Sequence, residues 1–202
     1  METTYRKGTL NDCDTLADLH LKAFDNFFMA SLGKYFLLKY YRAVLKTPET
    51  ICLFAEDDSG KMIGFVVGRT NTEGYLKRVL KKNIFSFIPV GVMLLFNHPQ
   101  RLIRLYKNLK KKNEQIENQQ NYAEIGLIGV SPEFKGLGIG RSLLNRVESI
   151  LKQSNVNRLS LTTDFYNNED TLAAYQKWGF EVYYEFIAYP NRRMYRLIKI
   201  LD

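Results

Sequence analysis

The sequence has 202 residues, of which 46% are hydrophobic and 25% are charged, and its formal net charge is +8. This composition excludes a disordered or fibrous chain and predicts one domain, residues 1–202, with a substantial core. Cys13 and Cys52 lack the spacing of a disulfide framework or a zinc site, and the polar first residues do not resemble an export signal. We therefore expect a cytoplasmic protein without a structural metal.

The first part of the chain predicts a strand, two helices and a hairpin. Residues 5–10 can open as a strand, and Asn11 is the expected N-cap of a helix that extends to about Phe24. Residues 32–45 are apolar on most sides, which predicts a second helix that is largely covered by protein. The runs 51–56 and 61–68 are strand-like and are joined by Asp57-Asp58-Ser59-Gly60, a typical hairpin turn.

Residues of about 74–121 are predicted to form a basic helical insertion. Between Gly74 and Lys112 the chain has ten Lys or Arg residues and no Asp or Glu. The apolar run 84–96, interrupted by Pro89, is shorter than the ~20 residues of a membrane span. Residues 101–112 have the pattern of a basic amphipathic helix, and residues 113–121 form a polar connection.

This concentration of positive charge favours a local acidic contact, such as a substrate phosphate or a peripheral membrane surface. A solvated helix face explains the same charges. We do not expect a nucleic-acid partner, because the basic residues belong to no nucleic-acid-binding motif.

The second part of the chain is more regular. It predicts a strand over 122–130, a helix from Gly140, a strand over 158–163 and a short helix over 168–177. Residues 180–188 and 192–200 then predict a second hairpin. The whole order, β-α-α-β-β, insertion, β-α-β-α-β-β, predicts an α/β (α+β) fold with a central mixed sheet between helices.

The most informative stretch lies between the strand and the helix, Lys135-Gly136-Leu137-Gly138-Ile139-Gly140. Alternate glycines let the backbone approach a ligand closely, and a helix start offers free N–H groups to an anion such as a pyrophosphate. The Rossmann and Walker patterns are not met, since Arg141 stands where the Rossmann pattern needs glycine. Plain packing of a glycine-rich turn is the alternative interpretation.

This turn resembles the pyrophosphate loop of the GNAT N-acetyltransferase superfamily, Gln/Arg-x-x-Gly-x-Gly/Ala, with Lys135 at the usual Gln/Arg position. The resemblance continues at Val130-Ser131-Pro132, at Ala173 or Ala174 and at Gly179-Phe180. It implies a GNAT fold and the transfer of acetyl from acetyl-CoA to a primary amine by direct attack in a ternary complex. The cofactor contacts that it implies are Ile128, Gly129, Val130, Lys135, Gly136, Leu137, Gly138, Ile139, Gly140, Arg141, Ser142 and Asn168.

The same resemblance implies two catalytic residues. Tyr175 matches a tyrosine that protonates the departing thiolate, although a tyrosine on a helix also packs well in a core. Glu124 occupies a position where relatives carry a base for the attacking amine, although it could equally be an ordinary edge carboxylate. With only His20 and His98 in the chain, no catalytic triad is expected.

The acceptor is expected to contact His20, Phe24, Phe27 and Phe28, because the fold builds that site from its first helices. Their pattern and the basic insertion resemble GNAT proteins associated with bacterial surface-polysaccharide synthesis. An amino sugar that carries phosphate is therefore one expected acceptor. The alternatives are a protein or peptide N-acetyltransferase and a non-catalytic, membrane-associated acyl-CoA-binding module, and the chain could be a monomer or a homodimer.

Overall fold

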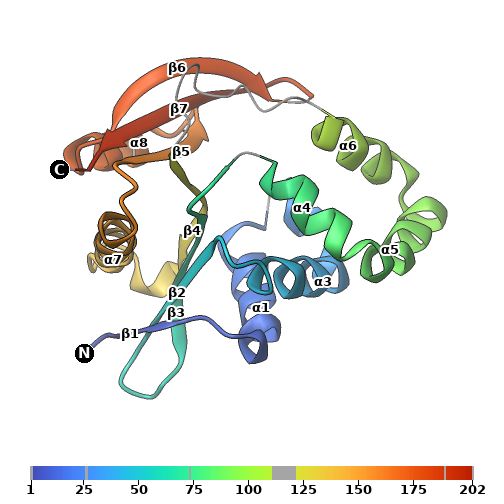
Figure 1. The fold of residues 1–202 in the computed structure, drawn as a ribbon, viewed down its shortest axis with the longest axis horizontal. Helices are drawn as coiled ribbons and strands as arrows, with labels where there is room; N and C mark the ends of the chain where they lie inside the picture. The colour runs from blue at the N-terminus through green and yellow to red at the C-terminus, as the bar shows by residue number, and fades with distance from the viewer. Residues whose placement is uncertain (1, 26, 73, 111–121, 189, 202) are drawn as a thin grey trace.

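The computed structural model describes residues 2–25, 27–72, 74–110, 122–188 and 190–201, and it is organised around a seven-stranded mixed sheet (Figure 1). The strand order is β1-β2-β3-β4-β5-β7-β6, and β4 and β5 are its parallel neighbours. The strands are β1 (Thr4–Lys7), β2 (Thr50–Glu56), β3 (Met62–Arg69), β4 (Ala123–Val130), β5 (Arg158–Asp164), β6 (Glu181–Ala188) and β7 (Arg192–Ile200).

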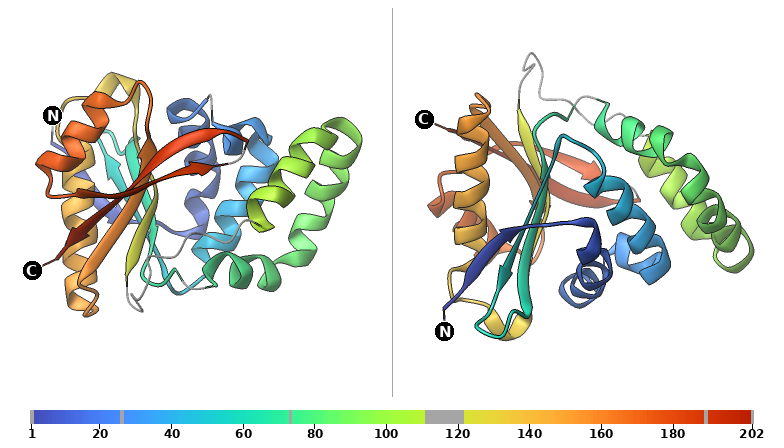
Figure 2. Two further views of the ribbon diagram at one scale, coloured as in Figure 1. Left: turned by 90° about the horizontal axis from the view of Figure 1, so that it is seen from above. Right: turned by 60° about the horizontal axis from the view of Figure 1, so that its bottom comes forward.

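Helices cover both faces of this sheet (Figure 2). One face carries α1 (Cys13–Ala23), α2 (Phe28–Ser31) and α3 (Gly33–Leu45), with α4 (Tyr75–Lys82), α5 (Ile84–Asn97) and α6 (Pro99–Lys110) further out. The other face carries α7 (Ile139–Gln153) and α8 (Glu169–Lys177). The mixed α/β fold is thus confirmed, and the insertion forms three helices.

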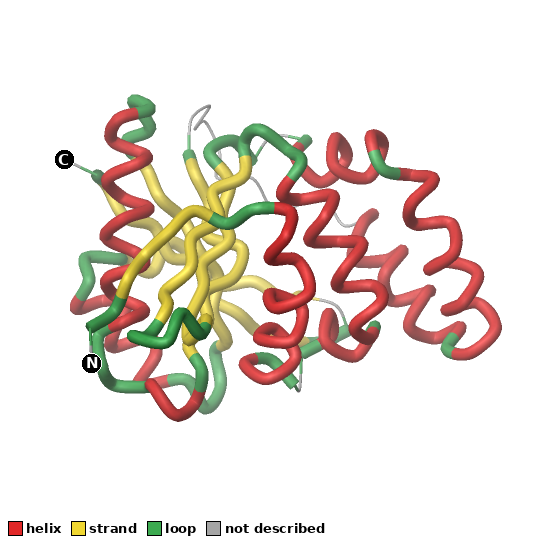
Figure 3. Tube along the Cα trace, turned by 90° about the horizontal axis from the view of Figure 1, so that it is seen from below, coloured by secondary structure: helices red, strands yellow, loops and turns green. Residues whose placement is uncertain are grey.

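Each face has its own hydrophobic core, because alternate residues of a strand point to opposite sides of a sheet. Cys52, Phe54 and Phe65 face α1 and α3, whereas Leu53 and Ala55 face α7. The layering, with the sheet between α7 and the group of α1 to α6, is visible in Figure 3. The sheet therefore separates two hydrophobic cores that pack independently of each other.

One local expectation was wrong. The first helix is not capped by Asn11. Thr9 and Asp12 form a capping box around a 3-10 turn over Leu10–Asp12, and α1 begins only at Cys13. The Asp12 carboxylate accepts the Thr9 N–H at 2.7 Å and also binds Arg6, which holds the turn in place.

Pro89 interrupts the apolar run of residues 84–96 but not the helix that this run forms. It lies inside α5, which runs unbroken from Ile84 to Asn97. A proline inside a helix removes one amide donor and crowds the carbonyl four residues before it, and the packing of α5 against α3 and α6 offsets this cost. The predicted polar connection, 113–121, lies outside the described residues.

Candidate active site

A break in strand pairing marks the centre of the site. The parallel pairing of β4 with β5 covers only three residues of each strand, Ala123 to Ile125 against Leu159 to Leu161. Beyond Ile125, β4 continues to Val130 with β3 as its only paired neighbour in the described sheet. Residues 126–130 therefore have backbone N–H and C=O groups, on the edge of β4 that faces β5, that form no hydrogen bond with a neighbouring strand.

A β-bulge lies where the two strands separate. Val67 of β3 pairs with Leu127, and the next residue, Gly68, pairs with Ile125, so Gly126 is the extra residue of β4. Bulges bend a strand and re-aim its side chains. This bulge, together with the loss of pairing, leaves the edge of Ile128, Gly129 and Val130 open, as the cofactor prediction requires.

The glycine turn leads from this open edge into α7. Gly136 and Gly138 have φ angles of +82° and +76°, in the left-handed region that side chains with a Cβ rarely adopt. The first intrahelical bond runs from the Ser142 N–H to the Gly138 carbonyl, and no described carbonyl accepts from the amides of residues 139–141. The turn thus presents free N–H groups at the positive end of a helix, which suits a pyrophosphate.

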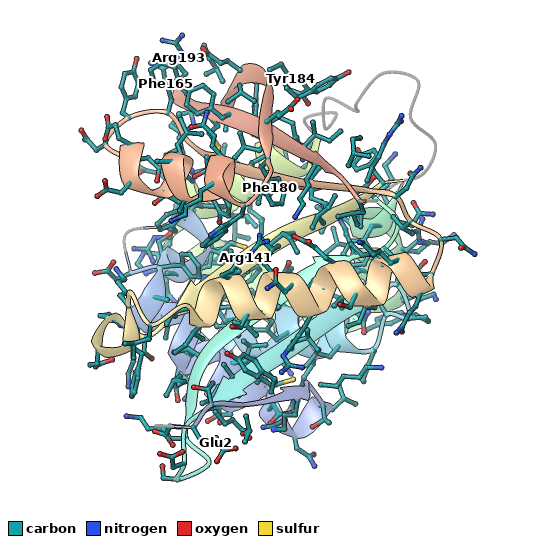
Figure 4. The ribbon with its side chains drawn as sticks, turned by 90° about the vertical axis from the view of Figure 1, so that its left-hand side faces the viewer. Glu2, Arg141, Phe165, Phe180, Tyr184 and Arg193 are labelled. Atoms are coloured by element: carbon teal, nitrogen blue, oxygen red, sulfur yellow. The ribbon has the colours of Figure 1, made fainter. Side chains whose placement is uncertain are left out.

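Trp178 joins this turn to α8. Its indole lies next to Gly140, where a Cβ would be 4.0 Å from the ring. Arg141 points from α7 toward α8, with its guanidinium 5.7 Å from the indole centroid (Figure 4). The Tyr175 ring lies 5.6 Å from the same indole, so Trp178 brings the predicted acid close to the predicted phosphate turn.

Tyr175 is half-buried against Trp178 and Phe180. Burial raises the pKa of its phenol to about 12, so the hydroxyl remains protonated at neutral pH. A protonated phenol can donate a hydrogen bond to a neighbouring anion. Tyr175 can therefore pack in the core and donate a hydrogen bond at the same time, so the two interpretations of this residue are compatible.

Asn168 connects β5 to α8. Its side-chain amide donates to Thr163 Oγ1 at 2.6 Å and to the Asp164 carbonyl at 2.8 Å. These bonds fix the end of β5 on the side where it separates from β4. Asn168 therefore has a structural role in this arrangement, and its contact with the cofactor stays a prediction.

Glu124 is buried between two arginines. Its carboxylate forms ion pairs with Arg69 of β3 at 2.5 Å and with Arg196 of β7 at 3.2 Å. Burial by itself would raise the pKa of Glu124, but the two guanidinium groups outweigh it and lower the pKa below the ordinary value. The side chain is thus an ionised, weak base, and only 9% of the residue is exposed.

The predicted acceptor residues begin at the end of α1. A Cβ on Gly129 would lie 3.1 Å from the Phe24 ring, so glycine lets this aromatic wall pack directly on the open edge of β4. His20 lies behind Phe24, with the ring centroids 5.2 Å apart, and is only 1% exposed. A side chain in this position cannot contact an acceptor directly, and we assign to His20 the role of supporting the Phe24 ring.

His20 is held as a neutral ring. Its Nδ1 lies 2.5 Å from the Tyr41 hydroxyl, and its buried Nε2 has no hydrogen-bond partner among the described residues. Burial lowers the pKa of His20 to about 4. A charged imidazole at this place would lose hydration without gaining a counter-ion.

Phe27 and Phe28 carry arginines from two distant segments. Arg104 of α6 stacks over the Phe28 ring at 4.4 Å, and Arg192 of β7 stacks over the Phe27 ring at 4.7 Å. Arg101 also donates a hydrogen bond to the Ser31 carbonyl at the end of α2. The expected acceptor wall therefore carries arginines as well as aromatic rings, and the Arg192 guanidinium is at the same time ion-paired with the Asp164 carboxylate of β5.

The model of the acetyltransferase (GNAT) family matches residues 14–180 of this sequence. The chain belongs to this family. No curated protein sequence matches the chain.

Solved structures share the fold at low sequence identity. The ribosomal-protein-S18-alanine N-acetyltransferase of Escherichia coli is 14% identical, with a TM-score of 0.61 over 100% of this chain and 95% of its own. The PaiA N-acetyltransferase of Thermoplasma acidophilum, solved with coenzyme A, is 17% identical, with a TM-score of 0.60 and 99% of both chains covered. A spermidine N-acetyltransferase chimera from Vibrio cholerae and hSSAT is 16% identical, with a TM-score of 0.63 over 100% and 96%.

Membership in the GNAT family makes this chain an N-acetyltransferase that uses acetyl-CoA as its acyl donor. The residues present fit that cosubstrate. The open edge of β4 can bind an extended arm through backbone groups, and the turn from Lys135 to Ser142 can bind its phosphates. No group of acidic, histidine or cysteine side chains in the described ranges could hold a metal ion.

Four side chains of the candidate site were not predicted from the sequence, namely Arg69, Trp178, Arg192 and Arg196. Each of the three arginines contacts a site residue that is distant in the sequence. Arg69, for example, forms an ion pair with Glu124, and Arg192 lies over the Phe27 ring. Only for Trp178 did the sequence hold a signal, because it stands three residues after Tyr175 at helical spacing. The arginines could not be told from ordinary charged strand residues.

Proposed function

We propose that this GNAT enzyme acetylates a primary amine on a small, anionic acceptor, and that the acceptor is an amino sugar that carries phosphate. The observation that supports this class is the pair of arginines, Arg104 and Arg192, stacked on the aromatic residues of the expected acceptor wall. Aromatic rings pack on the faces of a sugar, and guanidinium groups bind phosphate oxygens.

The reaction proceeds by direct attack of the amine nitrogen on the thioester carbonyl carbon. The new C–N bond forms as the C–S bond breaks, the thiolate of coenzyme A leaves, and the amine gives up one proton. A backbone N–H of residues 128–130 donates to the carbonyl oxygen as negative charge develops there. The open edge of β4 supports this step, since its amides on that side have no strand partner.

Tyr175 stabilises the departing thiolate. A phenol whose pKa is about 12 does not readily give its proton to a thiolate whose conjugate acid has a pKa of ~8.5. It can donate a strong hydrogen bond to that anion without transferring the proton. We therefore propose hydrogen-bond donation as the main contribution of Tyr175.

Glu124 stays our candidate for the base. The buried carboxylate can accept the proton of the acceptor amine only through an intervening water, because Arg69 and Arg196 enclose it. Its lowered pKa makes proton uptake transient. This proposal requires a water chain between the acceptor and β4.

The proposed function is tested by thiol release from acetyl-CoA, with mass analysis of the product, across matched acceptors. The panel contains a nucleotide-linked amino sugar, the same amino sugar without phosphate, a peptide and a polyamine. We expect the highest kcat/KM with the phosphate-bearing sugar. Exclusive turnover of the peptide or of the polyamine would refute the sugar assignment.

Variants separate recognition of phosphate from catalysis. Arg104→Gln and Arg192→Gln should each raise KM for the phosphate-bearing sugar about tenfold, with little effect on the sugar without phosphate. Arg193→Gln is the matched control for Arg192→Gln, because each arginine pairs with one carboxylate, Arg192 with Asp164 and Arg193 with Glu185. Arg193 stacks on Phe165 and not on the acceptor wall. If all three variants raised KM equally, the change would come from the net charge of the protein and not from contacts of Arg104 and Arg192 with the phosphate.

A further inference from the structure

Helix α5 has two apolar faces, and only one of them is covered. Phe87, Val90 and Leu94 point inward, where they belong to the core shared with α1 and α3. The opposite side is formed by apolar residues that are half or more exposed. This outer face consists of Ile84, Phe85, Ile88, Val92, Leu95 and Phe96.

The most protruding residues of the outer face lie near its two ends. Phe85 is 83% exposed and Phe96 is 80% exposed. At about 3.6 residues per turn and about 1.5 Å per residue, positions eleven apart point in nearly the same direction and lie ~17 Å apart. The two rings therefore lie along one line parallel to the helix axis, with the other residues of the outer face between them. Figures 1 and 3 show α5 on the outside of the molecule, remote from α7 and α8.

Positive charge adjoins this surface. Lys77, Lys81 and Lys82 of α4 are exposed, and none forms an ion pair with another described residue. Lys82 is two residues from Ile84, where the outer face begins. No acidic residue occurs between Glu73 and Glu114, so the charge of the three helices is not neutralised within their own sequence.

We propose that the outer face of α5 docks on an anionic membrane surface, with α5 lying in the plane of the interface and the α4 lysines among the lipid headgroups. An anionic membrane surface binds an exposed apolar strip that is bordered by lysines. The strip buries its apolar area among the lipid chains, and the lysines are attracted to the anionic headgroups.

The helix geometry favours a peripheral position. No single described helix is long and apolar enough to cross a membrane, and α4 and α5 meet the criterion only as a pair bent by 88°. A helix whose anchoring rings lie on one side and whose other side belongs to the protein core cannot be surrounded by lipid. Docking through one face is the arrangement that keeps the core of α5 intact.

Charge also argues against a second copy of this chain as the occupant. A symmetric pair of outer faces would bring the two sets of α4 lysines together, and α4, α5 and α6 contain no acidic residue to compensate them. Like charges at an interface oppose association, whereas anionic headgroups attract both sets.

The inference goes beyond the proposed acetyl transfer and does not depend on the acceptor. It has a spatial consequence for the site, however. Helix α6 packs on α5, and its Arg101 and Arg104 contact α2, so the docking surface and the acceptor wall are joined by one helix. An enzyme docked in this way would hold its acceptor wall beside the membrane surface.

Co-sedimentation with vesicles tests the inference. The full-length protein should bind vesicles of phosphatidylcholine with phosphatidylglycerol at low salt, bind less at high salt, and bind poorly to vesicles of phosphatidylcholine alone. The double variant Phe85→Ser/Phe96→Ser should lower partitioning by more than about tenfold, and Lys81→Gln/Lys82→Gln by about tenfold or more. Both pairs are exposed, so thermal unfolding should be unchanged.

Lys152→Gln/Lys177→Gln is the matched control, because it removes two exposed lysines from α7 and α8 on the opposite side of the sheet. It should bind as the unaltered protein does. Equal loss in this control, or no binding to anionic vesicles at low salt, would overturn the proposal. A dimer in light scattering that the Phe85→Ser/Phe96→Ser variant converts to monomer, without vesicle binding, would assign the face to a second copy instead. Acetyl transfer to a free acceptor in solution should be the same in all variants, so failure of docking is distinguishable from failure of the proposed function.

Discussion

The two substrates of this enzyme are expected to meet surfaces of different physical kinds. The cofactor side, made of the end of β4, the glycine turn, α7 and α8, offers mainly backbone groups. The acceptor side, made of α1 to α3 and the insertion, offers aromatic and charged side chains from distant segments. A site built on the backbone depends on a few glycines, whereas a site built on side chains depends on tertiary packing.

This difference determines where substitutions should act. Ionisable groups buried under the acceptor side, such as Glu124 and His20, are linked to the stability of the whole fold. Groups on the cofactor side, such as Tyr175 and Gly138, should affect ligand binding or rate more than stability. The following predictions run from the largest expected effect to the smallest.

Glu124→Gln should lower the free energy of unfolding by about 3–5 kcal/mol, because it leaves Arg69 and Arg196 buried without their counter-ion. Chemical denaturation at neutral pH measures this loss. Glu185→Gln, at an exposed pair with Arg193, is the control and should cost less than about 1 kcal/mol. Equal costs would mean that burial of the Glu124 pairs contributes nothing.

The same variant tests the base. The pKa of Glu124 is lowered in the fold, so its stabilising contribution is present above the unfolded value of 4.5 and is lost as pH falls through the folded pKa. Below that value Glu124→Gln should therefore approach the stability of the unaltered protein. Across the pH range in which the Glu124→Gln variant remains folded, its turnover should be reduced, and the reduction should be largest at the low end of that range. An unchanged pH–rate profile would remove Glu124 from the base role.

His20 should make stability depend on mildly acidic pH. Its pKa falls from 6.5 to about 4 on folding, which corresponds to about 3 kcal/mol of stability. The folded pKa is the lower one, so this contribution is complete above pH 6.5 and disappears as pH falls toward about 4. His20→Gln, which cannot titrate, should lose less stability than the unaltered protein between these values. If the free energy of unfolding depended on pH in the same way in both proteins, the lowered pKa of His20 would be contradicted.

Tyr175→Phe should lower kcat about tenfold to a hundredfold, the loss expected for one hydrogen bond to a developing anion. Its stability and its affinity for coenzyme A should change little, because the ring keeps its contacts with Trp178 and Phe180. Steady-state kinetics and calorimetry separate these effects. Full acetyl transfer by the folded variant would show that the hydroxyl has no part in the reaction.

Gly138→Val should cost about 1–2 kcal/mol of stability, because φ is +76° there, and should weaken coenzyme A binding by more than about tenfold. Gly60→Val is the matched control. Gly60 has φ +79° and open space around it, like Gly138, but lies in the β2–β3 hairpin. The control should lose similar stability and keep its affinity in calorimetry; equal loss of affinity would place the phosphates elsewhere.

Local sequence signals predicted most of the fold. The amphipathic helix predicted from Gly140, the two hairpins and the helical nature of the described part of the insertion are all confirmed by the structure. The error lay where a side chain decided the outcome. Asn11 was the expected cap, but the contact of Asp12 with Thr9 and Arg6 moved the start of the helix.

The candidate site divided in the same way. The glycine turn and Tyr175 could be read from the sequence, whereas the enclosure of Glu124 by Arg69 and Arg196 could not. Those two arginines are more than fifty residues from Glu124 in one direction and seventy in the other. Nothing in their own neighbourhoods marks them as its partners.

The sequence by itself determined the backbone features of this acetyltransferase, because a glycine with positive φ and a helix start are local properties of a few consecutive residues. Only the tertiary structure decided which side chains are buried together, which charges are neutralised and which face of α5 remains open. Those properties depend on contacts between strands and helices far apart in the chain, and no local pattern encodes them.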